Sequence, residues 1–343
     1  MENGSESNDA GYLQVQDLRV QYRGRGSLFT KARPVRAVDG VSLDIRKGET
    51  LGLVGESGCG KSSLGRAILR LTEPSGGRVM FKGKDLSGLP ASAMREQRRQ
   101  LQMIFQDPYA SLNPRMTASQ TIGEPIRAFR LASGNAVDNI VSELMESVGL
   151  PGRLAGHYPH QFSGGQRQRI GIARALAAGP ELIVADEPIS ALDVSIQAQI
   201  MNLLKRLQAA KGLTYLFISH DLRAVRHMAD RVAVMYLGKI VELASGKDLY
   251  SGPLMPYTKA LISALPVADP AVDLGREHII LKGDVPSPID PPAGCRFHTR
   301  CPFAIEDCRR VEPQLVEIKP DHHAACIRIS PAHPHIEENA ELA

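Results

Sequence analysis

The sequence predicts an α/β fold in which a mostly parallel β-sheet is covered by helices. Short apolar runs at residues 49–54, 101–105, 182–185 and 214–219 have the length and composition of buried strands. Segments with the apolar period of an amphipathic helix follow these runs along the chain. Because strands that alternate with helices usually form a parallel sheet with helices on both faces, this order predicts the fold class.

The first 46 residues add an antiparallel portion to this fold. Residues 12–22 and 35–46 alternate apolar and polar side chains, as half-buried antiparallel strands do. The buried strand at 49–54 then leads through a glycine-rich loop into a helix expected at 61–71. Further elements expected in this half are a strand at 79–83, an exposed basic helix at 91–99 and the strand at 101–105.

A helical subdomain is expected at about residues 108–165, because 118–150 has a helical period that is interrupted only at Pro125 and Gly134. The parallel α/β pattern resumes after it. The elements expected there are helices at 163–178, 194–210 and 222–228 and strands at 182–185, 214–219, 232–237 and 240–243.

Length, charge and apolar content limit the classes of protein. A chain of 343 residues that is 43% hydrophobic suits roughly two or three folded domains. The longest apolar run, 232–237, is far shorter than the roughly 20 residues of a membrane-spanning helix. The acidic residues 1–11 lack the features of a signal peptide, so we expect a disordered tail on a cytosolic protein. A net charge of +4, from 41 basic and 37 acidic residues, does not favour nucleic acid as a partner.

Residues 55–62, Gly-Glu-Ser-Gly-Cys-Gly-Lys-Ser, match the P-loop pattern. In a P-loop the glycines let backbone N–H groups surround phosphates, while Lys61 reaches the β- and γ-phosphates and the Ser62 hydroxyl binds Mg²⁺. A glycine-rich turn that fits by chance is the alternative interpretation. The strand before this loop and the helix after it favour a nucleotide site.

Two adjacent carboxylates, Asp186 and Glu187, follow the buried strand at 182–185. Neighbouring strand residues point in opposite directions, so Asp186 can reach Mg²⁺ while Glu187 faces an attacking water. Phosphoryl transfer needs a positioned water and neutralisation of the developing charge. Such a pair is more often part of a surface turn, but the number of residues between it and the P-loop favours a role in nucleotide hydrolysis.

Together with a third motif at 162–166, Phe-Ser-Gly-Gly-Gln, these features resemble the nucleotide-binding subunits of ATP-binding cassette (ABC) transporters over residues 12 to about 245. The resemblance implies an ABC ATPase domain at 12–250 that hydrolyses ATP. Phe162 stands where leucine is usual, and Ile189 where threonine is usual; neither change removes a functional group. The loop at 190–193 is expected to cross a dimer interface.

The site residues follow from that resemblance. The catalytic residues are expected to be Glu187, the switch histidine His220 and the Q-loop glutamine Gln106. Tyr22 is expected to stack on adenine, and Phe29 is the less favoured choice for this role. The other residues expected to bind ATP are Gly55, Glu56, Ser57, Gly58, Cys59, Gly60, Lys61, Ser62, Ser63, Ser163, Gly164, Gly165 and Gln166. The expected Mg²⁺ contacts are Ser62, Gln106 and Asp186. Because residues 163–166 begin a second helix remote from their own P-loop, two chains facing head to tail are expected to enclose each ATP.

A C-terminal extension, residues 251–343, contains four of the five cysteines: Cys295, Cys301, Cys308 and Cys326. They are separated by five, six and seventeen residues. Clustered thiols in a cytosolic protein suggest metal binding or a redox role, because disulfides are rare there. The spacing is not the paired C-x-x-C of common zinc sites, and four thiolates are also what a [4Fe–4S] cluster takes. A cluster, a zinc ion and buried thiols without metal remain the three alternatives. His298, His322 and His323 are possible substitute ligands, although surface positions are expected for them.

Residues 105–114, 253–261 and 294–302 resemble the dipeptide and oligopeptide importers among the ABC transporters, and residues 61–66 resemble the second of their two paired ATPases. This resemblance implies a cluster of the [4Fe–4S] type in the extension. It implies as partners a second ABC ATPase, two transmembrane permease subunits and, indirectly, a solute-binding protein, at the cytoplasmic face of the inner membrane. Nickel or another small solute remains an alternative to peptides, because other subunits select the substrate.

Two other classes of ABC protein fit poorly. A soluble ATPase of DNA repair or chromosome structure needs long coiled-coil arms, but only 56 residues without heptads separate Gln106 from Ser163. A translation-factor type would need two cassettes, whereas the sequence contains one. The sequence therefore predicts an energy-coupling subunit of an importer.

Overall fold

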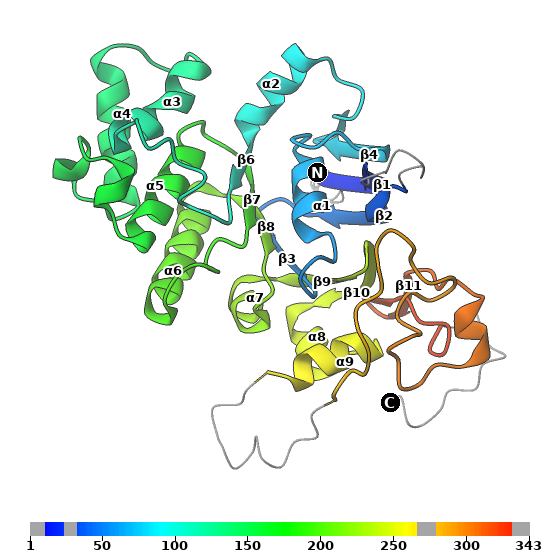
Figure 1. Cartoon of the computed structure of the whole chain (residues 1–343). Coiled ribbons are helices and arrows are strands. Elements are labelled where there is room, and N and C mark those ends of the chain that lie inside the picture. Colours follow the sequence, from blue (N-terminus) through cyan, green and yellow to red (C-terminus); the bar gives the residue numbers. More distant parts are fainter. Residues whose placement is uncertain (1–10, 24–32, 266–278, 331–343) are drawn as a thin grey trace, which may run out of the picture. The chain divides into compact units, whose positions relative to one another are not determined.

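The computed structural model of the chain (Figure 1) describes residues 11–23, 33–265 and 279–330. Almost all of the expected N-terminal tail, and Phe29, lie outside the described residues. The chain forms two compact units. The first comprises Met1–Leu13, Asp44–Thr50 and Met80–Ser219, and the second comprises Gln14–Leu43, Leu51–Val79 and His220–Ala343. Each unit is therefore built from segments that lie far apart in the sequence.

The first unit contains three parallel strands in the order β8-β7-β6. They are β6 (Leu101–Ile104), β7 (Leu182–Asp186) and β8 (Thr214–Ile218). Every residue of β7 and β8 is buried, which explains why both strands are continuous apolar runs in the sequence. The prediction of a parallel sheet is confirmed for these strands.

Five α-helices of the first unit agree with the sequence pattern: α2 (Ala91–Gln100), α3 (Ala118–Ala128), α4 (Asn135–Ser147), α5 (Gly164–Leu176) and α6 (Val194–Lys211). Short 3₁₀ turns at Gly152–Leu154 and Pro159–Gln161 precede α5. The expected interruption at Pro125 is wrong, because Pro125 lies inside α3. A capping box at Thr117 and burial of Ile122 and Ile126 stabilise this helix despite the N–H group that proline lacks.

In the second unit, strand β3 (Thr50–Val54) pairs in parallel with β9 (Arg231–Tyr236), which pairs antiparallel with β10 (Lys239–Ser245). The sheet continues through β12 (His322–Ala324) and β11 (Val316–Lys319) of the C-terminal extension. These last two strands were not predicted, because they are short and only partly buried. The extension thus adds strands to the sheet that carries the P-loop.

A smaller sheet contains β1 (Leu13–Tyr22), β2 (Val35–Ile45) and β4 (Gly76–Phe81), with β1 in the middle. The end of β4 turns back through Lys82 and Gly83 into β5 (Lys84–Asp85). Both turn residues have positive φ, of 52° and 78°, as tight hairpin turns require. The predicted strands of this region are confirmed.

Among its described residues, the second unit has the helices α1 (Lys61–Ile68), α7 (Leu222–Met228), α8 (Gly246–Ser251) and α9 (Pro256–Ser263), and a 3₁₀ turn at Glu306–Arg309. Helix α1 ends three residues before the predicted end at Leu71. Arg70 there has a φ of 48°, and the Leu71 N–H donates to the Arg66 carbonyl at 2.8 Å, which closes the helix. Within the described part of the chain, no helix combines the length and the apolar character needed to cross a bilayer.

Candidate active site

The P-loop of the second unit has a backbone that only glycine fits at two positions. Gly55 has a φ of +151°, and a Cβ there would lie 2.1 Å from the Met235 carbonyl oxygen. Gly60 has a φ of +109°, and a Cβ there would lie 2.0 Å from the Ala37 carbonyl oxygen. The loop is therefore packed closely between β9 and β2, and substitution of either glycine would displace it.

Lys61 begins α1, and its ammonium group is held against the loop. Its Nζ donates to the Gly55 carbonyl at 2.7 Å and to the Glu56 carbonyl at 3.0 Å, and the residue is only 5% exposed. The N-cap residue Gly60 offers no side-chain cap to the helix. A positive charge and the N-terminal N–H groups of α1 thus meet at one point, as an anion-binding loop requires.

Tyr22, at the end of β1, lies beside the first turn of α1. Its hydroxyl donates to the Ser63 hydroxyl oxygen at 3.2 Å, and the residue is 38% exposed. The structure therefore brings together Tyr22 and the P-loop helix, which the sequence separates by about forty residues. An exposed aromatic ring at this place can stack on a base.

Cys59 lies inside the P-loop but is buried, with 3% exposure. Burial raises the pKa of its thiol, even though the Lys61 ammonium acts in the opposite direction. The thiol is therefore neutral at pH 7, and a neutral buried thiol is a poor nucleophile. Cys59 therefore contributes to the packing of the loop and does not act as a nucleophile.

His220 follows β8 and precedes α7, at the start of the last segment of the second unit. The residue is exposed. The next residue, Asp221, caps α7 by accepting from the Arg223 N–H at 2.8 Å. This cap fixes the point at which the chain turns from strand to helix and so fixes the backbone at His220.

The two predicted carboxylates lie in the first unit, at the end of β7. Asp186 is fully buried. Glu187 has a φ of 45°, which is unusual for a residue with a side chain, and its N–H donates to the Ile218 carbonyl at 2.9 Å. Left-handed backbone at a non-glycine residue costs about 1–3 kcal/mol and is concentrated at functional sites.

Gln106 and Glu187 are in direct contact. The Gln106 side-chain amide donates to the Glu187 carboxylate, with 2.9 Å between Nε2 and Oε2. The sequence predicts both as site residues but gives no reason for them to touch. Gln106 follows β6 and Glu187 follows β7, and these strands are parallel neighbours, so their carboxyl ends meet at one sheet edge.

Residues 163–166, which are expected to bind ATP and are called the signature residues below, form the N-terminus of α5. Ser163 accepts from the Gln166 N–H at 3.3 Å, and Gln166 accepts from the Ser163 N–H at 3.0 Å, which is a complete capping box. A Cβ on Gly165 would lie 2.6 Å from Cγ2 of Ile196 on α6. The glycine is thus needed for the packing of α5 on α6, and the side chains of Ser163 and Gln166 stabilise the helix end.

The predicted site residues therefore form two groups, one in each unit. The second unit holds Tyr22, the P-loop and His220, and the first unit holds Gln106, Asp186, Glu187 and the signature residues. Within each group the structure brings residues distant in sequence together, through the contacts of Tyr22 with Ser63 and of Gln106 with Glu187.

Comparison with known proteins gives the family. A family model described as ABC transporter matches residues 38–190, and one described as the C-terminal region of oligopeptide/dipeptide transporters matches residues 241–308. The oligopeptide transport ATP-binding protein AppF of Bacillus subtilis is 53% identical and is matched over 93% of this chain and 98% of its own length. A second Bacillus subtilis relative, YkfD, is 55% identical over 96% of both chains. The chain belongs to the ABC transporter ATPases.

Solved structures agree with this assignment. The ATP-binding cassette MJ0796, solved as a dimer in a post-hydrolysis state bound to ADP and Pi, has a TM-score of 0.61 and 30% identity, and covers 68% of this chain. The structure of cbiO1 from Clostridium perfringens, part of an ABC transporter complex, has a TM-score of 0.60 and 25% identity, and covers 70% of this chain. The ABC cassette fold is thereby confirmed, and the chain is an ATPase of this family.

Two arginines of this ABC ATPase that the sequence did not single out support the site residues of the first unit. The Arg167 guanidinium lies 3.7 Å from the centre of the Tyr109 ring, and Arg174 donates to the Ser111 carbonyl at 2.5 Å. Helix α5 thus holds the segment that follows Gln106. The signal in the sequence is the seven-residue spacing of the two arginines, which places them on one helix face.

Gln197 supports the loop that follows Glu187. Its amide donates to the carbonyls of Ile189 at 3.2 Å and Leu192 at 3.0 Å. Ser190 also donates its hydroxyl to the Glu187 carbonyl at 3.1 Å. The segment at 190–193 is therefore tied at both ends, although the sequence gives no sign of the role of Gln197.

The four cysteines of the C-terminal extension line one small cavity of the second unit, together with apolar side chains such as Phe297 and Ile327. No disulfide joins them. Burial raises the pKa of Cys295 to about 12 and that of Cys301 to about 11, and the other cysteines add to both shifts. His298 hydrogen-bonds the Cys295 carbonyl, and His322 hydrogen-bonds Glu242. The surface position expected for His322 is wrong, because this residue is only 3% exposed.

The spacing of the cysteine side chains is not that of a formed metal site. In the part of the chain that the structure describes, no three His, Cys, Asp or Glu side chains are arranged closely enough to hold a metal ion. The chemistry of four convergent thiols nevertheless fits a thiolate-ligated metal group, since coordination deprotonates thiols even where burial raises their pKa.

Proposed function

We propose that this ABC ATPase binds ATP with Mg²⁺ at its P-loop and hydrolyses it to power the import of dipeptides or oligopeptides. Lys61 and the N–H groups of residues 55–63 bind the phosphates, and Tyr22 stacks on the adenine. Ser62, Gln106 and Asp186 supply the oxygen ligands that Mg²⁺ prefers. Glu187 is the general base for the attacking water, and His220 contacts the γ-phosphate.

The observation that supports this proposal most is the conformation of the P-loop. The loop is fixed by Gly55 and Gly60, and the ammonium of Lys61 lies over it at the N-terminus of α1. Charge-assisted hydrogen bonds of this kind contribute about 1.5–3 kcal/mol each to phosphate binding. An arrangement that concentrates backbone and ammonium donors in one loop suits a triphosphate.

The partners follow from the relatives and from the signature. A similar cassette was solved as a dimer with ADP and Pi, which supports a dimer here. We infer that residues 163–166 bind the γ-phosphate of ATP held by a second ABC ATPase, identical or homologous. Two permease subunits and a solute-binding protein complete the importer, with this chain bound peripherally at the cytoplasmic face of the inner membrane. Residues 12–250 form the ATPase domain and 251–343 the extension.

The substrate class rests on the relatives, since AppF is named for oligopeptide transport and is 53% identical. ATP-dependent uptake of a labelled tripeptide by proteoliposomes that contain the full importer tests it. We expect uptake with the wild-type chain and none with Lys61→Ala. Accumulation of nickel or another small solute without peptide uptake would exclude the peptide assignment.

We further propose that Cys295, Cys301, Cys308 and Cys326 hold a [4Fe–4S] cluster. Their convergence on one cavity supports this. Such a cluster would join four points of a segment that contains little regular structure, and so stabilise it. Analysis of iron and acid-labile sulfide after anaerobic purification is the test. Zinc in place of iron, or a colourless metal-free protein, would reject the cluster.

A further inference from the structure

The P-loop of this ABC ATPase is held from the C-terminal extension through one residue, Glu56. The Arg300 guanidinium binds the Glu56 carboxylate in a bidentate manner, with Nη1 2.7 Å from Oε2 and Nη2 3.1 Å from Oε1. The Arg300 side chain is 8% exposed and that of Glu56 is 25% exposed. A bidentate, largely buried arginine–carboxylate pair is a strong and directional contact.

Tyr257 of α9 makes a second contact with the same residue. Its hydroxyl accepts from the Glu56 backbone N–H at 2.9 Å, and the residue is fully buried. Glu56 thus uses its carboxylate for Arg300, its N–H for Tyr257 and its carbonyl for the Lys61 ammonium. The position of Lys61 is therefore linked through Glu56 to Tyr257 and Arg300, which lie 201 and 244 positions after Glu56.

An aromatic cluster fixes the positions of Tyr257 and Arg300, the two residues that contact Glu56. The rings of Tyr236 and Tyr257 lie 4.7 Å apart, and Phe297 lies 5.3 Å and 5.4 Å from them. The Arg300 N–H donates to the Phe297 carbonyl at 3.0 Å. Because Phe297 and Arg300 lie between the first two cysteines of the extension, the fold of the cysteine segment determines where the guanidinium lies.

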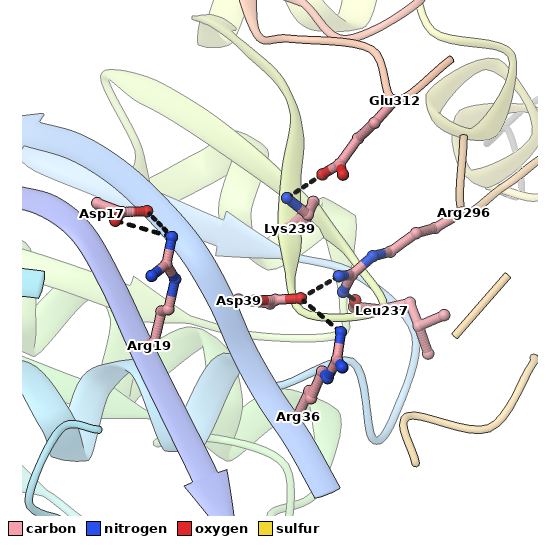
Figure 2. Close-up of polar contacts among 8 residues, drawn as sticks. All are labelled: Asp17, Arg19, Arg36, Asp39, Leu237, Lys239, Arg296 and Glu312. Atoms are coloured by element: carbon pink, nitrogen blue, oxygen red, sulfur yellow. Dashed lines mark hydrogen bonds and ion pairs between the residues drawn. The ribbon is translucent and has the colours of Figure 1, made fainter. Parts of the chain in front are cut away.

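A second route joins the extension to the loop, and Figure 2 shows its first contacts, at Arg296. Arg296 binds the Asp39 carboxylate and donates to the Leu237 carbonyl at 2.5 Å. The neighbouring Gly238 N–H donates to the carbonyl of Cys59 in the P-loop at 2.9 Å. The extension therefore supports the P-loop at Glu56 directly and at Cys59 through the turn between β9 and β10.

The contact between Arg300 and Glu56 also has an electrostatic role, because Glu56 is negatively charged. A carboxylate in a phosphate-binding loop repels the triphosphate, and the repulsion is strong where water is partly excluded. Hydrogen bonding to Glu56 raises the pKa of Arg300, so the guanidinium keeps its charge at all relevant pH values. The pair is neutral as a unit and presents no net repulsion to an anion.

We propose that Arg300 and Tyr257 are positioning residues of the nucleotide site, through which the cysteine-containing extension holds the P-loop and neutralises Glu56. The affinity for nucleotide then depends on the extension. This inference rests on the proposed binding of ATP at the P-loop.

Equilibrium binding of a fluorescent ATP analogue with Mg²⁺ to the full chain tests the proposal. Arg300→Gln leaves the carboxylate unneutralised, and we expect about tenfold weaker binding, as for the loss of one charge-assisted contact. Adding Glu56→Gln should restore the affinity to within about threefold of wild type, because the pair then lacks both charges. Tyr257→Phe keeps the ring packing and removes one acceptor, so we expect weaker binding with little loss of stability.

Arg310→Gln is the matched control, because Arg310 lies in the same extension but forms an exposed pair with Glu306 at 3.0 Å. We expect it to bind like wild type. Wild-type affinity in Arg300→Gln, or a loss that Glu56→Gln does not rescue and that follows the melting temperature, would overturn the inference. Failure of the wild-type chain to bind, or undiminished binding by Lys61→Ala, would instead contradict the proposed function.

Discussion

Gln106 donates a hydrogen bond of 2.9 Å to the carboxylate of Glu187, and the two residues lie at the ends of adjacent parallel strands. The contact holds the carboxylate of the proposed base by an amide that can also contact water or Mg²⁺. Arg167 and Arg174 of α5 in turn hold Tyr109 and Ser111, just after Gln106. Movement of α5, the helix that begins at the signature residues, is therefore transmitted to Glu187 through these contacts.

The first prediction concerns Glu187. Glu187→Gln keeps the shape of the side chain and its contact with Gln106 but removes its basicity. We expect the rate of phosphate release to fall about 10²–10⁴-fold, the usual contribution of a general base, with nucleotide binding retained. The mutant should also trap a closed dimer, visible by size-exclusion chromatography with ATP. Turnover at the wild-type rate would refute the role of Glu187.

The second prediction concerns the packing of α5 on α6. Gly165→Ala places a Cβ 2.6 Å from Cγ2 of Ile196, and we expect a loss of about 1–3 kcal/mol in the free energy of unfolding. Gly164→Ala is the matched control, because its Cβ would meet Leu192 at an ordinary 3.5 Å. Urea denaturation measures both. Ile196→Ala in the Gly165→Ala background should recover most of the loss, and equal stability of the two alanine variants would contradict the packing argument.

Elements whose ends carry a local signal were well predicted from the sequence. Helix α7 begins and ends at the predicted residues, because Asp221 caps its first turn. Helix α1 ends before the predicted residue because the backbone at Arg70 is left-handed, and the spacing of apolar residues does not reveal this. Pro125 predicts an interruption, but the burial of one face of α3 stabilises the helix by more than the loss of one hydrogen bond at the proline destabilises it.

The features that could not be predicted from the sequence depend on contacts between residues far apart in the chain. The residues of the P-loop and the two carboxylates have recognisable spacing, but the pairing of Gln106 with Glu187 depends on strand order. Strand β12 pairs with β10, and β11 pairs with β12, so both depend on partners that their own short sequences do not reveal. Arg300 was missed because its partner lies 244 residues earlier, and a lone arginine between cysteines has no periodicity to reveal it.

The third prediction concerns a buried pair in the second unit. Glu242 is fully buried and accepts from the N–H groups of Leu254 and Met255, while His322 Nε2 lies 2.7 Å from its Oε1. His322→Ala leaves the carboxylate short of one partner, so we expect a loss of about 1–3 kcal/mol in the free energy of unfolding. His323→Ala, at a half-buried site next to it, should cost much less in the same denaturation experiment. Equal losses would show that the contact with Glu242 is not the cause.

The last prediction is a dependence of stability on pH that originates at Asp39. Burial alone would raise the pKa of Asp39, but the hydrogen bond and charge of Arg296 lower it below its usual value (Figure 2). Because the folded pKa is below the unfolded value of about 3.9, the stabilisation is complete above that pH and is lost as the pH falls toward the folded pKa. Arg296→Gln should therefore be less stable than wild type at pH 7 in urea denaturation, with a difference that shrinks as the pH falls below about 3.9. Arg19→Gln, which breaks the exposed pair with Asp17, is the control and should show the same dependence of stability on pH as the wild type. A difference between Arg296→Gln and wild type that is the same at every pH would mean that packing, and not the ionised Asp39, is the source of the effect.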